Sequence, residues 1–153
     1  MPDLLPPKLA ELLELFDSLG NTDERVALLL DYAGRYREVS PRIATRPFPE
    51  EHRVQFCESE AYVWVIAQPD GTLQLHFAVE NPSGVSAKAL AAILESTLSG
   101  LRPEQIVTIP EDIVSRIFRQ NMSMGKGMGL MSMIRTVKAF ASRSVKDQVH
   151  QVE

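Results

Sequence analysis

The chain has 153 residues, the length of one ordinary domain, and its hydrophobic and charged fractions, 44% and 24%, are typical of a globular protein with a core. A net charge of −4 without a concentrated basic patch excludes general nucleic-acid binding. No apolar run approaches the roughly 18 residues of a membrane span, and residues 1–7 lack the features of a signal peptide. With a single cysteine and no export signal, we expect a cytoplasmic protein.

The first 35 residues predict a helical hairpin. Two prolines open its first helix, whose buried positions recur at helical spacing: Leu9, Leu12, Leu13 and Phe16. Asn21 is suited to cap the second helix, with Glu24 three residues later completing a capping pair. We expect one stripe of the second helix to face the core: Val26, Leu29, Leu30 and Ala33. Residues 39–51 hold three prolines and predict an extended connector.

Strand patterns occupy the centre of the chain. Residues 54–56 predict a short strand, and residues 62–67 predict a second one. Pro69-Asp70-Gly71 signals a turn, and apolar and polar residues alternate after it over residues 72–79. These three antiparallel strands would form a small sheet with one apolar face that needs cover.

Helical patterns return over residues 86–98, 111–120 and from residue 130 onward, with a short helical turn at 102–106. A loop with three glycines, residues 125–129, precedes the last helix. We therefore expect an α+β fold in which a small three-stranded antiparallel sheet packs against N-terminal and C-terminal helices. The chain 1–153 would be a single domain with an ordered core at about 5–142.

Cys57 is the only cysteine, and it directly follows the first predicted strand. A lone thiol cannot close an intramolecular disulfide, nor can it supply the four clustered ligands of a structural zinc site. Two interpretations remain, a small buried apolar residue or a reactive thiol near a strand end. Composition alone favours burial, because free cysteine is among the most buried residue types.

Several motifs, spaced along the chain, carry a family resemblance. The sharpest is residues 54–59, Val-Gln-Phe-Cys-Glu-Ser, which parallels the pattern Val-x-Gly-Cys-x-Ser. Further matches follow in order: Lys88 with Leu90, Pro103 to Ile106, Gly129-Leu130, and Met133-Ile134-Arg135. Over residues 5–142, roughly, the chain resembles the SufE family of sulfur acceptors, which includes CsdE and has a SufE/NifU-like fold.

The resemblance implies that Cys57 accepts sulfur from the persulfide of a SufS-type cysteine desulfurase, stimulates that enzyme, and delivers the sulfur to a SufBCD-type scaffold for iron–sulfur cluster assembly. Pyridoxal phosphate would belong to the desulfurase, so we expect this chain to need no cofactor and to be a transfer partner rather than an independent enzyme. Related zinc-binding and cluster-building proteins use three cysteines, and a single thiol cannot cage a metal. The oligomeric state stays open, although related proteins form weak homodimers.

The chain also departs from the family pattern. Phe56 replaces the glycine before the cysteine, at backbone angles that glycine adopts without strain and Phe does not. The acidic Asp-x-Asp segment aligns with Asn81-Pro82-Ser83, and Lys126 replaces an arginine, which keeps the charge but loses the bidentate fork. These departures leave a second function open, namely a SufE-fold module that docks on a desulfurase without transferring sulfur.

Sulfur transfer requires a thiolate, and a free cysteine with a pKa of about 8.5 is only about 3% thiolate at neutral pH. His52, Arg53 and Lys126 are candidate positive neighbours that would modulate the thiol or bind a partner, Lys126 only if the glycine loop folds over the thiol. Ser59 is a candidate for hydrogen bonding within the cysteine loop.

In SufE-like proteins the resting thiol lies in an apolar pocket. We therefore expect a dormant Cys57 that swings out when a partner docks. Phe56 and Trp64 are candidate walls of that pocket, although both residue types are more often simply core. The glycine loop at 125–129 would be mobile and would let a partner reach the thiol.

Overall fold

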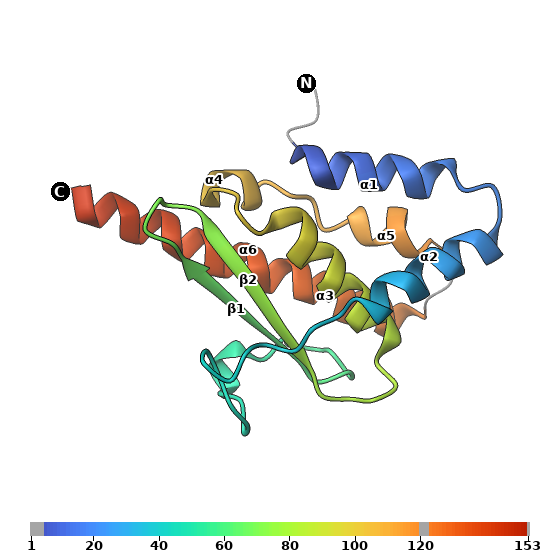
Figure 1. Cartoon of the computed structure of the whole chain (residues 1–153), viewed down its shortest axis with the longest axis horizontal. Coiled ribbons are helices and arrows are strands. Elements are labelled where there is room, and N and C mark those ends of the chain that lie inside the picture. Colours follow the sequence, from blue (N-terminus) through green and yellow to red (C-terminus); the bar gives the residue numbers. More distant parts are fainter. Residues whose placement is uncertain (1–4, 120–122, 153) are drawn as a thin grey trace.

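The computed structural model describes residues 5–119 and 123–152, with side chains up to residue 145. Figure 1 shows a long hairpin of two strands that lies along helices α3 and α6, with the α1–α2 hairpin at one end of the molecule. The elements in chain order are α1 (Pro7–Ser18), α2 (Thr22–Gly34), a 3-10 turn (Glu50–His52), β1 (Ala61–Ala67), β2 (Leu73–Val79), α3 (Val85–Leu98), α4 (Pro103–Ile106), α5 (Ile113–Phe118) and α6 (Met124–Val152).

Strands β1 and β2 pair antiparallel, from Ala61 opposite Val79 to Ala67 opposite Leu73. Alternation of side chains gives the hairpin two faces. The inner face packs into the main core with α3 and α6 through residues such as Val63 and Phe77. The outer face is covered by the connector, residues 39–48, which forms a second, smaller core with it: Val39, Phe48, Tyr62, Trp64 and Ala78. The α+β prediction is thus confirmed, with both sheet faces covered.

The predicted third strand at 54–56 is wrong, because the described residues form a two-stranded sheet. Arg53 makes only an isolated bridge to Tyr62, and the chain then turns over residues 55–60. The physical reason lies in Phe56, whose φ of 59° is left-handed and incompatible with an extended strand. The segment thereby leaves the plane of the sheet just before the cysteine.

The N-terminal hairpin forms as predicted in its first helix and at its cap. The predicted stripe of α1 is buried, and the Asn21 side chain accepts a hydrogen bond from the Glu24 main-chain N–H at 2.8 Å. The predicted core stripe of α2 is wrong for Val26 and Leu30, which are 38% and 55% exposed, whereas Leu29 packs partly buried against the main core as predicted. The buried residue of α2 is instead a charged one, Arg25.

Arg25 fixes the rotation of α2. Its guanidinium donates hydrogen bonds to the carbonyl oxygens of Phe16, at 2.6 Å, and of Arg116 and Ile117, both at 3.0 Å, which lie at the ends of α1 and α5. These bonds satisfy carbonyls that the helix ends leave free. Burial, and after it the nearby charge of Arg119, lower the pKa of Arg25. With Arg25 turned inward, Val26 and Leu30 lie on the outer side of α2.

Helix α6 begins at Met124, so the predicted mobile loop at 125–129 is wrong and its glycines lie in the first turns of the helix. The Ser123 hydroxyl accepts a hydrogen bond from the Lys126 N–H at 3.2 Å and caps this end. The predicted stripe of α6 is buried, apart from a half-buried Phe140: Leu130, Met133, Ile134, Val137 and Ala141. The helix continues past residue 142 to Val152. No described helix is long and apolar enough to cross a membrane.

Candidate functional site

The cysteine turn, residues 55–60, connects the 3-10 turn to β1. Its ends are joined by a hydrogen bond from the Val54 N–H to the Ala61 carbonyl at 2.8 Å. Within it, the Glu60 N–H donates to the Cys57 carbonyl at 3.1 Å. Its base is held by the segment after β2, because the main-chain N–H groups of residues 80 and 81 donate to the carbonyls of residues 60 and 59, each at 3.1 Å. The base is therefore fixed to the sheet, while Phe56 and Cys57 form the tip.

Two residues of this turn have left-handed backbone angles, Phe56 with φ of 59° and Glu60 with φ of 54°. Each such angle costs a residue with a side chain about 1–2 kcal/mol. Phe56 is also 72% exposed, so packing of its ring offsets little of that cost. The turn keeps the backbone angle that glycine favours, although the residue at that position is Phe, and it stores strain next to the thiol.

Two glycines allow the rest of the fold to approach the turn closely. A Cβ atom on Gly129 of α6 would lie 3.1 Å from the Phe56 carbonyl oxygen and 3.2 Å from the Cys57 Cα. A Cβ atom on Gly84 would lie 2.9 Å from Ser59 Oγ and 3.0 Å from its Cβ. The turn thus lies in a slot between α6 and the start of α3 that glycine keeps open.

Cys57 is half-buried and packs against the main core, and two openings reach it. A cavity of about 100 Å³ is lined by Cys57, Ser59, Lys126 and the first turn of α3. A wider groove of about 530 Å³ lies beside it and is lined by Cys57 with Arg53, Phe56 and Met128. The thiol therefore lies between a small cavity and a wider, more open groove.

The structure brings three of the four predicted neighbours to Cys57. Ser59 and Lys126 share its cavity, with Lys126 exposed at the start of α6, and Arg53 shares its groove while pairing with Glu50 at 3.5 Å. The carboxyl of Glu58 is exposed and lines both openings, so the positive charge of Lys126 is partly opposed.

His52, the fourth predicted neighbour of Cys57, lies away from the thiol. Its Nδ1 is 2.8 Å from the Val63 carbonyl oxygen, and its ring stacks on Trp64 with centroids 5.0 Å apart and meets Phe140 edge-on. The 3-10 turn places this ring over the outer face of β1, away from both openings at the thiol. The prediction that His52 modulates the thiol directly finds no support in this geometry.

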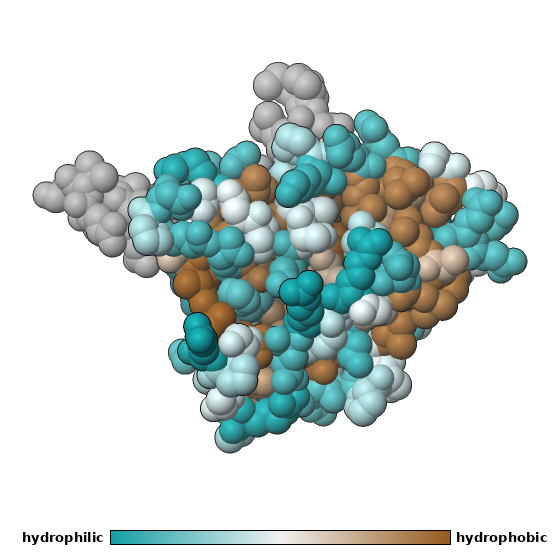
Figure 2. Space-filling view, in the orientation of Figure 1, coloured by the Kyte–Doolittle hydropathy of each residue, from teal (hydrophilic) through white to brown (hydrophobic). Residues whose placement is uncertain are grey.

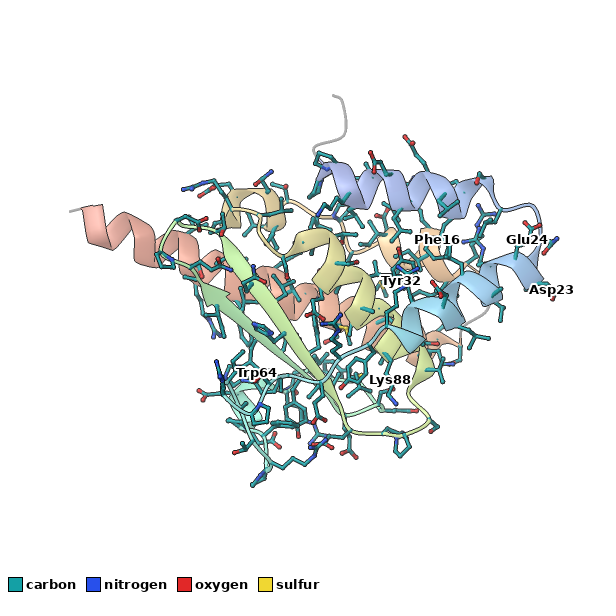
Figure 3. The ribbon with its side chains drawn as sticks, in the orientation of Figure 1. Phe16, Asp23, Glu24, Tyr32, Trp64 and Lys88 are labelled. Carbon is teal, nitrogen blue, oxygen red and sulfur yellow. The ribbon has the colours of Figure 1, made fainter. Side chains whose placement is uncertain are left out.

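The two predicted pocket walls also differ from expectation. Phe56 lines the open groove but leaves most of its ring in solvent. Trp64 is buried in the outer-face core, where its ring contacts Phe48 edge-on with centroids 5.3 Å apart (Figure 3). Trp64 is therefore a core residue, and the cavity at Cys57 is walled by backbone and small side chains of α3 and α6 instead.

The sequence did not reveal that Gly84 and Gly129 let neighbouring segments approach the cysteine turn closely. The sequence signal for both was weak, because a glycine needed for close approach looks the same as one in a loop. The segment that aligns with the acidic family pair forms a neutral turn, in which Asn81 Oδ1 accepts bonds from the Ser83 N–H at 3.0 Å and hydroxyl at 2.8 Å. Among the described residues, no group of three or more His, Cys, Asp and Glu side chains could hold a metal ion.

The chain is similar to known proteins along most of its length. The SufE family model, described as "Fe-S metabolism associated domain", matches residues 10–141. The chain is 30% identical over 135 residues to "SufE-like protein 1, chloroplastic/mitochondrial" of Arabidopsis thaliana, covering 88% of this chain and 34% of that protein. It is 27% identical over 139 residues to "Cysteine desulfuration protein SufE" of Plasmodium vivax, covering 90% of this chain and 54% of that protein.

The chain thus spans about a third and about half of the length of these two relatives, 34% and 54%. A solution structure of a hypothetical protein from Thermus thermophilus matches with a TM-score of 0.73 and 26% identity, covering 93% of this chain and 98% of that one. The family match covers most of the chain and includes the cysteine turn and both glycines that enclose it. This chain belongs to the SufE family.

Proposed function

We propose that this protein accepts sulfur on Cys57 from the persulfide of a cysteine desulfurase, and that it hands the sulfur on to an iron–sulfur cluster assembly scaffold. The observation that carries the proposal is a half-buried thiol at the tip of a strained turn, between a small cavity and an open groove. Family membership supports it, since the matched domain is associated with Fe–S metabolism.

In the proposed transfer, the Cys57 thiolate attacks the outer sulfur of the donor persulfide. A bond forms between Cys57 Sγ and that sulfur, the sulfur–sulfur bond of the donor breaks, and its electron pair leaves on the donor cysteine as a thiolate. The exchange needs neither an oxidant nor a reductant. The persulfide formed on Cys57 then offers its outer sulfur to the next acceptor by the same chemistry.

The neighbours of Cys57 suit an anionic sulfur. Lys126 brings a positive charge to the cavity, and the first turn of α3, which has no side-chain cap, lines the same space with the positive end of the helix dipole. Ser59 offers a hydroxyl there. On the groove side, Arg53 stands where an incoming partner would meet the turn. We propose that docking moves the tip of the turn, since hydrogen bonds tie the base to the segment after β2, whereas the bond to the Cys57 carbonyl comes from within the turn itself.

The proposed partners are a SufS-type desulfurase, which would carry the pyridoxal phosphate, and a SufBCD-type scaffold. This chain would need no cofactor of its own in that scheme, and it would act as a transfer partner. A cytoplasmic location and a weak homodimer stay predictions.

The test is intact-mass measurement after incubation with desulfurase, pyridoxal phosphate and cysteine. The unmodified chain should gain one sulfur, about 32 Da, that reducing agent removes. Cys57→Ser should gain none and should lose its stimulation of sulfide release. Equal stimulation by Cys57→Ser would refute the proposal.

The same experiment separates the second function, a docking module without transfer. That function predicts binding to the desulfurase with no gain in mass on Cys57. The docking-module function was suggested by Phe56 in place of glycine. Phe56 nevertheless adopts the left-handed angle, and Cys57 still lines both openings, so this substitution gives the alternative little support.

A further inference from the structure

Helix α2 is apolar on two sides, and only one of them packs against the rest of the chain. Its inner side lies partly buried against the main core through Leu28, Leu29 and Tyr32. Its outer side carries Val26 and Leu30, which are 38% and 55% exposed. A surface helix normally keeps its outward side polar, and a helix that is apolar all round is usually buried. Among the described residues, nothing covers this outer side.

Helix α1 carries a further exposed apolar residue, Leu15, which is 46% exposed. Figure 2 shows an apolar area over the region where α1 and α2 meet. We call the surface formed by Leu15, Val26 and Leu30 the hairpin surface. No residue of α1 or α2 lines the cavity or the groove at Cys57, so the hairpin surface is separate from the thiol site.

The charges one helical turn from the apolar residues of the hairpin surface are acidic. Asp23 precedes Val26 by three residues and Leu30 by seven, so it shares their side of α2, and Glu11 precedes Leu15 by four residues on α1. None of the ion pairs formed by the described residues involves Asp23 or Glu11. Two copies facing each other here would bring like charges together, whereas a basic partner would complement them.

We propose that the hairpin surface docks a partner protein through an amphipathic helix whose apolar side is flanked by Lys or Arg. Val26 and Leu30 lie one helical turn apart, the spacing at which one helix anchors another. A partner held there leaves both openings at Cys57 free. The proposal rests on the proposed function only in its choice of probes, which are the desulfurase and the scaffold.

The experiment uses the full chain with Val26→Gln and Leu30→Gln, because Gln keeps helix propensity while removing the apolar contact. The matched control is Ile66→Gln, since Ile66 is 37% exposed and lies on β1, away from the hairpin surface. Dissociation constants are measured for purified desulfurase and scaffold in separate arms. The double variant should bind one of them at least about tenfold more weakly, a loss typical of a central interface contact.

Binding by the unmodified chain should also weaken as salt rises and on Asp23→Asn, because the flanking contacts are charge pairs. The Ile66→Gln control should bind like the unmodified chain. Unchanged affinity of the double variant for both probes would overturn the proposal. A self-association that the double variant abolishes would also overturn it, since the occupant would then be a second copy.

Failure of the proposed function is distinguishable from these outcomes. It would show as an absent mass gain on Cys57 in the unmodified chain, whatever the double variant binds. Circular dichroism checks the fold of each variant. If the double variant misfolds, Leu15→Gln on α1 tests the same surface without touching α2 and must weaken binding in the same arm.

Discussion

The two turns at the ends of β1 both contain left-handed backbone angles, but different residue types adopt them. The hairpin turn, residues 68–72, places Gly71 at its left-handed position, with φ of 87°. The cysteine turn places Phe56 and Glu60 at such angles, with φ of 59° and 54°. Glycine adopts these angles without strain, whereas Phe and Glu do not.

The turns also differ in what holds them. Residues within the hairpin turn stabilise it, because the Gln68 N–H donates to the Thr72 carbonyl at 2.8 Å and Asp70 accepts from the Thr72 hydroxyl at 2.6 Å. The cysteine turn depends on distant segments, through hydrogen bonds from residues 80 and 81 and the close contact with Gly129. Residues of the hairpin turn therefore stabilise it locally, whereas the cysteine turn is held in place by distant segments of the fold and is easier to displace.

The largest expected effect comes from Gly129→Ala, which breaks the contact that holds the tip of the cysteine turn. The added methyl group would lie 3.1–3.2 Å from main-chain atoms of Phe56 and Cys57, so the tip must move away from α6. We expect alkylation of the Cys57 thiol to speed up at least about threefold and stability to fall by about 1–3 kcal/mol, the usual cost of overpacking. Rates of reaction with iodoacetamide and urea unfolding measure the two effects.

Gly125→Ala is the matched control, because it lies one turn earlier on α6 and its added methyl group meets nothing within 4 Å. It should alkylate like the unmodified chain and be equally or more stable, since Ala favours helix over Gly. Equal alkylation rates for the Gly129 and Gly125 variants would show that α6 does not position the thiol.

A smaller effect is expected from Phe56→Gly, which gives the cysteine turn the residue that its backbone angle favours. Loss of strain should raise stability by up to about 1 kcal/mol, reduced by the greater entropy of glycine in the unfolded chain. The resting turn should then open less readily, and alkylation of Cys57 should slow. Urea midpoints and iodoacetamide rates are the measurements.

Gly71→Ala makes the opposite change in the hairpin turn and serves as the counterpart. It should lower stability by about 1 kcal/mol and leave the reactivity of Cys57 unchanged, because the hairpin turn lies at the other end of β1. A strong loss of stability on Phe56→Gly would instead mean that the exposed ring makes contacts that outweigh its backbone strain.

The smallest effect concerns Asp70 in the hairpin turn. The hydrogen bond from the Thr72 hydroxyl, and next that from the Thr72 main-chain N–H, lower the pKa of the Asp70 carboxyl. A carboxyl with a lowered folded pKa stabilises the fold above its unfolded pKa of about 3.9 and loses that contribution as the pH falls through the folded value.

Asp70→Ala should therefore be slightly less stable than the unmodified chain near neutral pH, and the difference should shrink below about pH 4. Urea unfolding at both ends of this range provides the measurement. A difference that stays constant with pH would contradict the role of the ionised carboxyl.

Local patterns predicted the elements whose residues settle their own structure. The α1 stripe, the Asn21 cap and the Pro69-Asp70-Gly71 turn all formed as expected, because each depends on neighbours within a few positions. The third strand failed at Phe56, because a segment with the alternating pattern of a strand, Val54-Gln55-Phe56, contains a left-handed residue that periodicity does not reveal.

The sequence pointed to Cys57 as the candidate thiol but predicted only part of the residues that surround it. Arg53, Ser59 and Lys126 line the openings at Cys57, and their role there stays a prediction, whereas Trp64 lies in the core on the outer face of the hairpin and the His52 ring stacks on it. Proximity along the chain suggested His52, but a ring only five residues from Cys57 lies on another face of β1.

The sequence by itself determined the α+β class, the single thiol and the family that its motifs share, because these follow from composition, periodicity and a handful of spaced residues. Tertiary structure alone decided which side of α2 faces the core, since two apolar sides compete and the hydrogen bonds of Arg25 to distant carbonyls select between them. It also decided the use of Gly84 and Gly129, because close approach between segments far apart in the chain leaves no local signal.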